Sequence, residues 1–111
     1  MRLPTDATLL LGEGADPELA RAWREERLPV LALAGEAGEA DLEALATATV
    51  LACGDGAIAT AGLAARMGFR TFLVGETAPD GVRAVTLAQA LEGARGARAR
   101  ERWKAARAVS D

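Results

Sequence analysis

The chain has 111 residues, half of them apolar and only 4% aromatic, and its formal net charge is −3. This length predicts a single domain with one modest core, which we expect to span residues 1–111. The sequence has no His and no Tyr, a single Cys and a single Lys. These absences exclude a Ser-His-Asp triad, a Cys-His dyad and zinc sites built from His and Cys.

Amide and thiol side chains are rare, since the chain has no Asn, one Gln and one Cys. Such a composition together with many charged residues is typical of thermophilic proteins, although GC-rich coding gives the same bias.

A single Cys forms no internal disulfide, which favours the cytoplasm. The N-terminal apolar stretch is too short for a signal peptide. The apolar window 44–65 has membrane-span length, but Gly54-Asp55-Gly56 interrupts it, so we interpret it as strand, turn and helix.

Short apolar runs alternate with helical patterns along the chain. Asp16-Pro17 has the character of an N-cap followed by proline at the first helical position. Thr86 and Gln89 have the spacing of a capping box. The predicted strands are residues 8–12, 30–34, 49–53, 70–75 and 82–85, and the predicted helices are residues 17–27, 40–46, 56–67, one that opens at Thr86, and a basic one at about 97–109.

This order predicts one α/β domain with three layers and an open, mainly parallel sheet of about five strands, of the flavodoxin or Rossmann type. We expect the strand order 2-1-3-4-5, which places a crevice between the turns that follow the first and third strands. The alternative order 3-2-1-4-5 would pair the first turn with Glu76 and Thr77.

Four strand exits share one pattern, an apolar run that ends in glycine followed by an acid. In a parallel sheet these acids lie at the carboxyl edge, where such folds bind ligands. Carboxylates gathered there repel one another unless a cation such as Mg²⁺ lies among them. Alternatively, the glycines only turn the chain out of each strand and the acids favour helix N-termini, with Asp55 as an N-cap. The four acids are Glu13, Glu36, Asp55 and Glu76.

Residues 49–75 contain the run VLACGDGA, then an Ala-rich helical segment, then a strand that ends in glycine. This segment resembles the strand–GGDGT–helix–strand segment in the nucleotide-binding N-terminal domain of the NAD kinase and diacylglycerol kinase superfamily. In that family the motif lies at the nucleotide phosphates, so the resemblance implies a nucleotide ligand and a catalytic Asp55. Cys53 replaces the first glycine of the motif and Ala57 replaces its threonine. The family's second, substrate-binding β domain has no counterpart in the sequence.

We expect a small module that binds a nucleotide-like ligand at the carboxyl edge without catalysis; the sequence identifies no cofactor and no metal ligand. One alternative is a Mg²⁺-dependent enzyme of phosphate chemistry that uses Asp55 and Glu13, and another is a self-associating structural protein. Cys53 is expected to be an inert, buried residue rather than a thiolate at a helix N-terminus. The predicted ligand-binding residues are Gly12, Glu13, Gly14, Cys53, Gly54, Asp55, Gly56, Glu76 and Thr77.

The helix predicted at residues 56–67 has only Thr60 and Arg66 as polar side chains. A helix that is apolar all round is normally buried, so we expect the C-terminal helix or a second subunit of a homodimer to cover it. Alternatively, alanine simply tolerates exposure. Residues 82–111 carry seven basic and three acidic side chains and could contact nucleic acid or an acidic protein surface. The overall acidity makes nucleic acid the weaker interpretation, and we expect no membrane partner.

Overall fold

A computed structural model describes residues 7–35 and 37–94 of the chain. Five strands form one sheet in the order β2-β1-β3-β4-β5, and every neighbouring pair is parallel. The strands are β1 (Thr8–Leu11), β2 (Val30–Ala32), β3 (Thr49–Cys53), β4 (Arg70–Val74) and β5 (Val82–Val85). The helices are α1 (Pro17–Glu25), α2 (Glu39–Glu43), the short 3-10 helix η1 (Asp55–Ala57), α3 (Ile58–Arg66) and α4 (Leu87–Ala94). The predicted α/β class and strand order are confirmed, whereas the predicted basic helix at about 97–109 lies outside the described residues.

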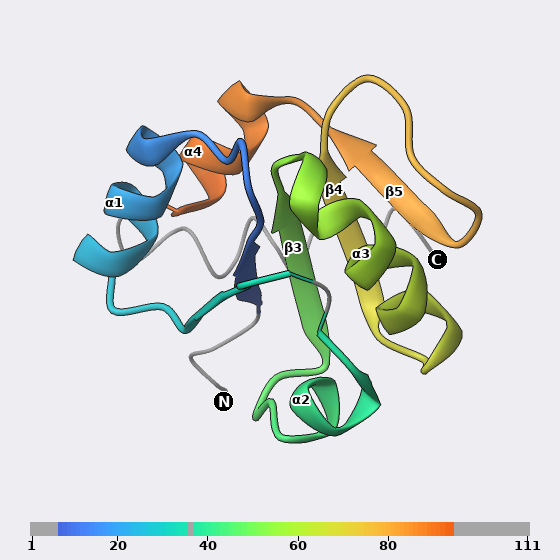
Figure 1. The fold of residues 1–111 in the computed structure, drawn as a ribbon. Coiled ribbons are helices and arrows are strands. Elements are labelled where there is room, and N and C mark those ends of the chain that lie inside the picture. Colours follow the sequence, from blue (N-terminus) through green and yellow to red (C-terminus); the bar gives the residue numbers. More distant parts are fainter. Residues whose placement is uncertain (1–6, 36, 95–111) are drawn as a thin grey trace.

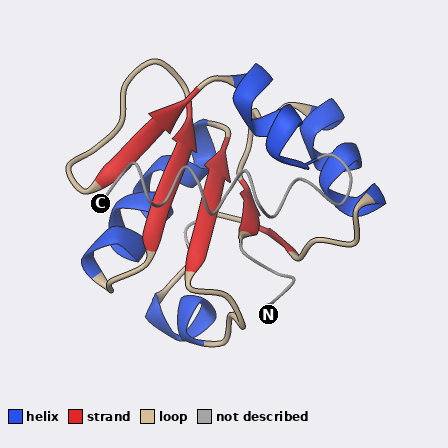
Figure 2. Ribbon diagram, turned by 180° about the vertical axis from the view of Figure 1, so that it is seen from behind, coloured by secondary structure: helices blue, strands red, loops and turns tan. Residues whose placement is uncertain are grey.

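Helices lie on both faces of the sheet, so the domain has three layers (Figure 1). α1 and α4 pack against one face, and α2 and α3 pack against the other. Seen from behind, α3 lies on the far side of β3 and β4 (Figure 2). All five residues of β3 are buried, as expected for the central strand of a parallel sheet that is covered on both faces.

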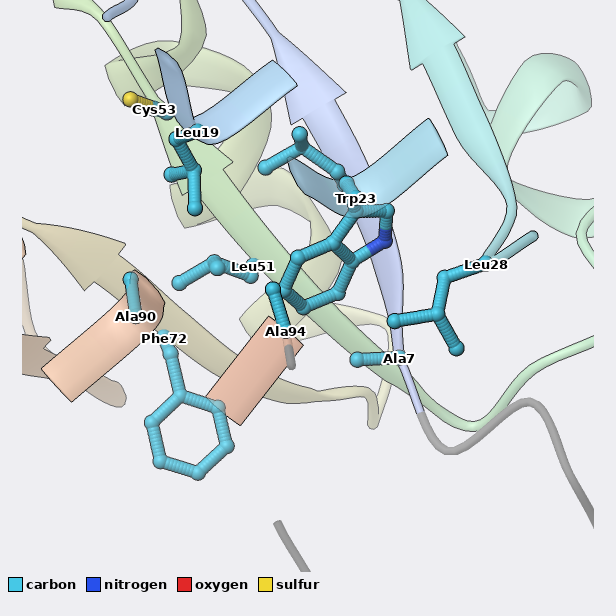
Figure 3. Close-up of a cluster of buried hydrophobic side chains, with 10 residues drawn as sticks. Ala7, Leu19, Trp23, Leu28, Leu51, Cys53, Phe72, Ala90 and Ala94 are labelled. Atoms are coloured by element: carbon cyan, nitrogen blue, oxygen red, sulfur yellow. The ribbon is translucent and has the colours of Figure 1, made fainter. Parts of the chain in front are cut away.

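The core on the α1 and α4 side is built around Trp23, whose side chain is fully buried. Its indole N–H donates a hydrogen bond to the Pro29 carbonyl oxygen at 3.0 Å, so the one polar atom of the ring is satisfied. Leu51 from β3, Phe72 from β4 and Ala94 from α4 belong to the same cluster (Figure 3). Burial of each large apolar side chain contributes about 1.5 to 3 kcal/mol, so this cluster is a main source of stability.

Two helix starts predicted from the sequence are confirmed. The Asp16 carboxylate accepts from the Glu18 backbone N–H at 2.8 Å, and proline follows Asp16 at the first helical position. At the start of α4 the Gln89 backbone N–H donates to the Thr86 hydroxyl at 3.0 Å, and the Gln89 side-chain oxygen accepts from the Thr86 backbone N–H at 2.9 Å. These caps satisfy backbone donors that a helix leaves free.

The helix after β3 begins differently from the prediction. It opens as η1, continues as α3 with Ala57 as N-cap, and has no side-chain hydrogen bond at the N-cap of either segment. The predicted N-cap role of Asp55 is therefore wrong. The reason lies in the turn itself: the Gly56 N–H donates to Glu13 O and the Ala57 N–H donates to Gly54 O, which holds the chain in a tight 3-10 turn.

The connection from β4 to β5 is a loop of residues 75–81 without a helix. It passes on the α3 side of the sheet, because Ala78 packs against the cluster around α3. Gly81 has φ +82°, and a Cβ built there would lie 3.3 Å from the Ala65 Cβ. The loop therefore runs close over α3, and its first residues, including Glu76 and Thr77, lie at the carboxyl edge of the sheet.

α3 is buried on one side only. Ala61 and Ala64 face the sheet and are fully buried, while Ile58, Ala59 and Arg66 are exposed. Among the described residues nothing covers this outer side completely. The C-terminal helix that we expected to cover it lies outside the described residues. No described helix has the length and apolarity that a membrane crossing needs.

Candidate functional site

A cavity of about 340 Å³ lies at the carboxyl edge of the sheet, where β3 and β4 end and α4 begins. Its apolar side chains come from three elements: Leu73 and Val74 from β4, Ile58 from α3 and Leu87 from α4. Its polar side chains lie in the loops that follow the strands. The remaining lining residues are Gly14, Asp16, Cys53, Gly54, Asp55, Gly75, Glu76 and Thr77.

The turns that follow β1 and β3 touch each other beside this cavity. The Gly12 N–H donates to Cys53 O at 2.9 Å, and the Gly56 N–H donates to Glu13 O at 3.1 Å. A Cβ added at Gly12 would lie 2.2 Å from the Ala57 nitrogen, and one added at Gly56 would lie 2.5 Å from the Glu13 nitrogen. No side chain fits at such distances, so these glycines allow two backbones to pack against each other.

Gly54 has the same role and an additional conformational one. Its φ is +95°, and an added Cβ would lie 2.7 Å from three backbone atoms, the nitrogen of Ala15 and the oxygens of Glu13 and Gly12. A side chain here would both strain the backbone and collide with the opposing turn. The space directly between the two turns is therefore filled by protein, and the cavity lies one strand further along, between β3 and β4.

The predicted site residues separate into two groups. Glu13 projects from the turn that packs on η1, and neither it nor Gly12 or Gly56 lines the cavity. The predicted residues that do line it are Gly14, Cys53, Gly54, Asp55, Glu76 and Thr77.

Sequence reasoning did not assign six lining residues to the site. The sequence indicates only an N-cap role for Asp16, and Asp16 has that role as well. Leu87 follows the capping-box threonine directly, so its place at the start of α4 could have been inferred, but its position beside β4 depends on the tertiary structure. The six are Asp16, Ile58, Leu73, Val74, Gly75 and Leu87.

Three carboxylates contribute negative charge to the cavity, from Asp16, Asp55 and Glu76. No basic side chain in the described part of the chain lines it. Asp55 and Glu76 are exposed, and Asp16 is partly buried. Across the residues that the structure describes, no group of three or more His, Cys, Asp or Glu is placed to hold a metal ion. Glu36, one of the four acids proposed for such a group, lies outside that part of the chain.

Cys53 closes β3 and is almost completely buried, with 3% of its surface exposed. Burial raises the pKa of its thiol above the ordinary value of 9.0, and the negative charge of Asp16 raises it further, while a hydrogen bond from the Asp16 backbone lowers it in part. The thiol is therefore protonated and a poor nucleophile at neutral pH.

A second cavity, of about 410 Å³, lies at the opposite, amino end of β4 and β5. It contains two arginine side chains, Arg70 and Arg83, on neighbouring strands. Its other lining residues are Phe69, Thr71, Phe72, Gly81 and Val82. The two cavities therefore have opposite charge, acidic at the carboxyl edge and basic at the amino edge.

Comparisons with protein-family models, with curated proteins and with solved structures gave no match to the chain. The resemblance of residues 49–75 to the NAD kinase and diacylglycerol kinase superfamily therefore stays a likeness of one segment. The inferences that follow depend on the geometry and chemistry of the described residues.

Proposed function

We propose that this protein is a small binding module that takes a nucleotide-like small molecule in the cavity at the carboxyl edge, without catalysis. The observation that carries the proposal is the position and size of this cavity, about 340 Å³ where β3 and β4 end. In open parallel α/β sheets, ligands bind outside the carboxyl ends of the strands. Small-molecule sites typically have volumes of about 300 to 1,000 Å³, so this cavity suits a ligand at the small end of the range.

The lining supports a ligand that has one apolar ring and several polar groups. Ile58, Leu73 and Leu87 offer apolar surface for a planar ring. Asp55 and Thr77 offer oxygen atoms at the rim, which accept hydrogen bonds from hydroxyl or amino groups. A few polar groups around an apolar surface are what small-molecule sites use to orient a ligand.

The side chains present support binding rather than catalysis. The chain has no His, which is the usual general base near neutral pH. The only thiol, Cys53, is protonated because burial raises its pKa. The carboxylates are the remaining acid–base groups of the cavity, and they suffice to hold a ligand.

Ligand titrations followed by amide chemical shifts test this proposal on a protein of 11.5 kDa. Nucleosides and nucleotides, each with and without Mg²⁺, are added to the full chain. We expect shifts at Gly54, Ile58 and Thr77, with a weaker effect of the same ligand on an Ile58→Ala variant. Shifts confined to Arg70 and Arg83 would refute the proposal, since the ligand would then occupy the other cavity. Absence of binding across the whole set would refute it as well.

Self-association through α3 is a second candidate function, because Ile58 at the first position of this helix is 41% exposed beside the cavity. Light scattering of the full chain at increasing concentration tests it, and a monomer at the highest concentration would contradict it. An Ile58→Asp variant should remain monomeric where the parent associates. The cytoplasmic location and the thermophilic origin stay predictions from composition.

A further inference from the structure

We infer that the carboxyl-edge cavity selects molecules without a phosphate group, with nucleosides as the fitting class, over their phosphorylated forms. This inference rests on the proposed function and narrows it. It follows from two independent features: four backbone donors of the glycine turns beside the cavity are already used, and the charged side chains that line the cavity are all acidic among the described residues.

The first feature is the use of backbone N–H groups by the protein itself. A phosphate at a glycine-rich turn is held by several converging N–H groups near a helix N-terminus. Here four such groups donate within the two turns: Gly12 to Cys53 O, Ala15 to Gly12 O, Gly56 to Glu13 O and Ala57 to Gly54 O, at 2.9 to 3.1 Å. The turns have the glycines of a phosphate-binding loop, but these four donors are used within and between the turns. None of the four residues lines the cavity, so these donors do not serve a phosphate there.

The second feature is the charge around the cavity. Asp16, Asp55 and Glu76 line it, and among the residues that the structure describes no Lys or Arg does. A phosphate group would add up to two negative charges beside these carboxylates, and like charges repel at such range even in a partly solvated site. The two arginines that line the basic cavity, Arg70 and Arg83, lie at the opposite end of β4 and β5.

The same carboxylates favour a ligand that donates hydrogen bonds. The hydroxyl groups of an unphosphorylated sugar, or amino groups, donate to carboxylate oxygens, and bonds to an ionised acceptor are stronger than neutral ones. Asp55 is exposed at the rim, while Ile58 beside it offers apolar surface. A nucleoside whose base lies against Ile58 and Leu87, and whose sugar hydroxyls face Asp55, matches both the apolar surface and the carboxylate.

The experiment compares adenosine, guanosine, cytidine and uridine with their 5′-monophosphates by amide-shift titration and calorimetry at low salt. We expect the preferred nucleoside to bind at least tenfold more tightly than its monophosphate, with shifts at Asp55 and Ile58. The ratio should fall when NaCl is raised from 0.05 to 0.5 M, because salt screens exposed charges.

Asp55→Asn should reduce the ratio of nucleoside affinity to monophosphate affinity by a factor of about three to ten. This is the range expected for the removal of one negative charge near the phosphate. The control is Asp80→Asn, which removes an exposed acid of the β4–β5 loop that does not line the cavity; it should leave the ratio unchanged. A monophosphate that binds this cavity as tightly as its nucleoside would overturn the inference and leave the proposed function standing. If neither form shifts the cavity residues, the proposed function fails with it.

Discussion

Replacement of Gly12 by alanine tests the contact between the turns that follow β1 and β3. The added methyl group would lie 2.2 Å from the Ala57 nitrogen, 2.5 Å from the Gly56 carbonyl carbon and 2.9 Å from the Ala57 Cα. All three are backbone atoms, so no side chain can rotate away. The two turns must separate, and this movement disturbs the hydrogen bonds from Gly12 to Cys53 O and from Gly56 to Glu13 O.

The expected loss of stability follows from these two effects. Overpacking of a tight contact costs about 1 to 3 kcal/mol, and each disturbed backbone hydrogen bond costs about 1 kcal/mol. We expect Gly12→Ala to lower the free energy of unfolding by at least about 3 kcal/mol. For a domain of this size such a loss corresponds to a fall in Tm of about 10 °C or more.

Gly62→Ala is the matched control, because it adds the same methyl group where there is room. Gly62 lies inside α3, and its added Cβ would meet only the flexible end of Arg66, at 3.5 Å. Alanine in a helix interior is favoured over glycine by about 0.5 to 1 kcal/mol, so this variant should be more stable than the parent. Urea unfolding followed by Trp fluorescence measures both variants. A Gly12→Ala protein within 1 kcal/mol of the parent would refute the close contact between the turns.

Three further predictions concern single side chains. The Thr47 hydroxyl donates to Thr49 O at 3.0 Å and therefore accepts from the Thr8 hydroxyl at 2.7 Å. Thr47→Val should lower the free energy of unfolding in urea by about 1 to 3 kcal/mol, and the additional change Thr8→Val should recover part of that loss. A double variant whose loss equals the sum of the two single losses would contradict the pairing. Thr86→Ala removes half of a capping box and should cost about 1 kcal/mol; an unchanged Tm would show that α4 does not depend on this cap. Burial raises the pKa of the Cys53 thiol above 9.0, so the unfolded chain loses the thiol proton at a lower pH than the folded chain does. Above about pH 9 the free energy of unfolding should therefore fall more steeply in the parent than in Cys53→Ala. Equal slopes for the two proteins between pH 8 and 11 would contradict the raised pKa.

The strands and most helix starts were predictable because their signals are local. Five apolar runs, the Asp16-Pro17 cap and the Thr86–Gln89 capping box each depend on residues adjacent in sequence, and the two caps form as expected. The start of α3 was not predictable in the same way. Its 3-10 opening depends on the hydrogen bond from the Gly56 N–H in η1 to Glu13 O in the turn after β1. These two residues are more than 40 positions apart in the chain, and local propensity carries no information about such a contact.

The loop between β4 and β5 was predictable from its turn residues, but the parallel pairing of these two strands and the cavity depend on the tertiary structure. A parallel pair usually needs a crossover of a dozen or more residues, yet residues 75–81 suffice here because the strands are short and the loop packs directly on α3. The cavity gathers side chains from β4, α3 and α4. Of the twelve lining residues, those at or after strand ends, such as Cys53, Glu76 and Thr77, could be assigned to the carboxyl edge from the sequence.

The glycines after β1 and β3 show why one sequence signal has two physical meanings. A turn needs glycine if a ligand approaches its backbone closely, and equally if another segment of the same chain does, because in both cases a Cβ would occupy the approach path. At Gly12 and Gly56 the nearest approaching atoms are backbone atoms of the opposing turn. These glycines are therefore explained by packing, and ligand recognition falls to other groups. Those groups are the apolar side chains and carboxylates of the neighbouring cavity. Recognition at this edge should therefore respond to substitution of Asp55 or Ile58, whereas substitution of the glycines should act first on the stability of the fold.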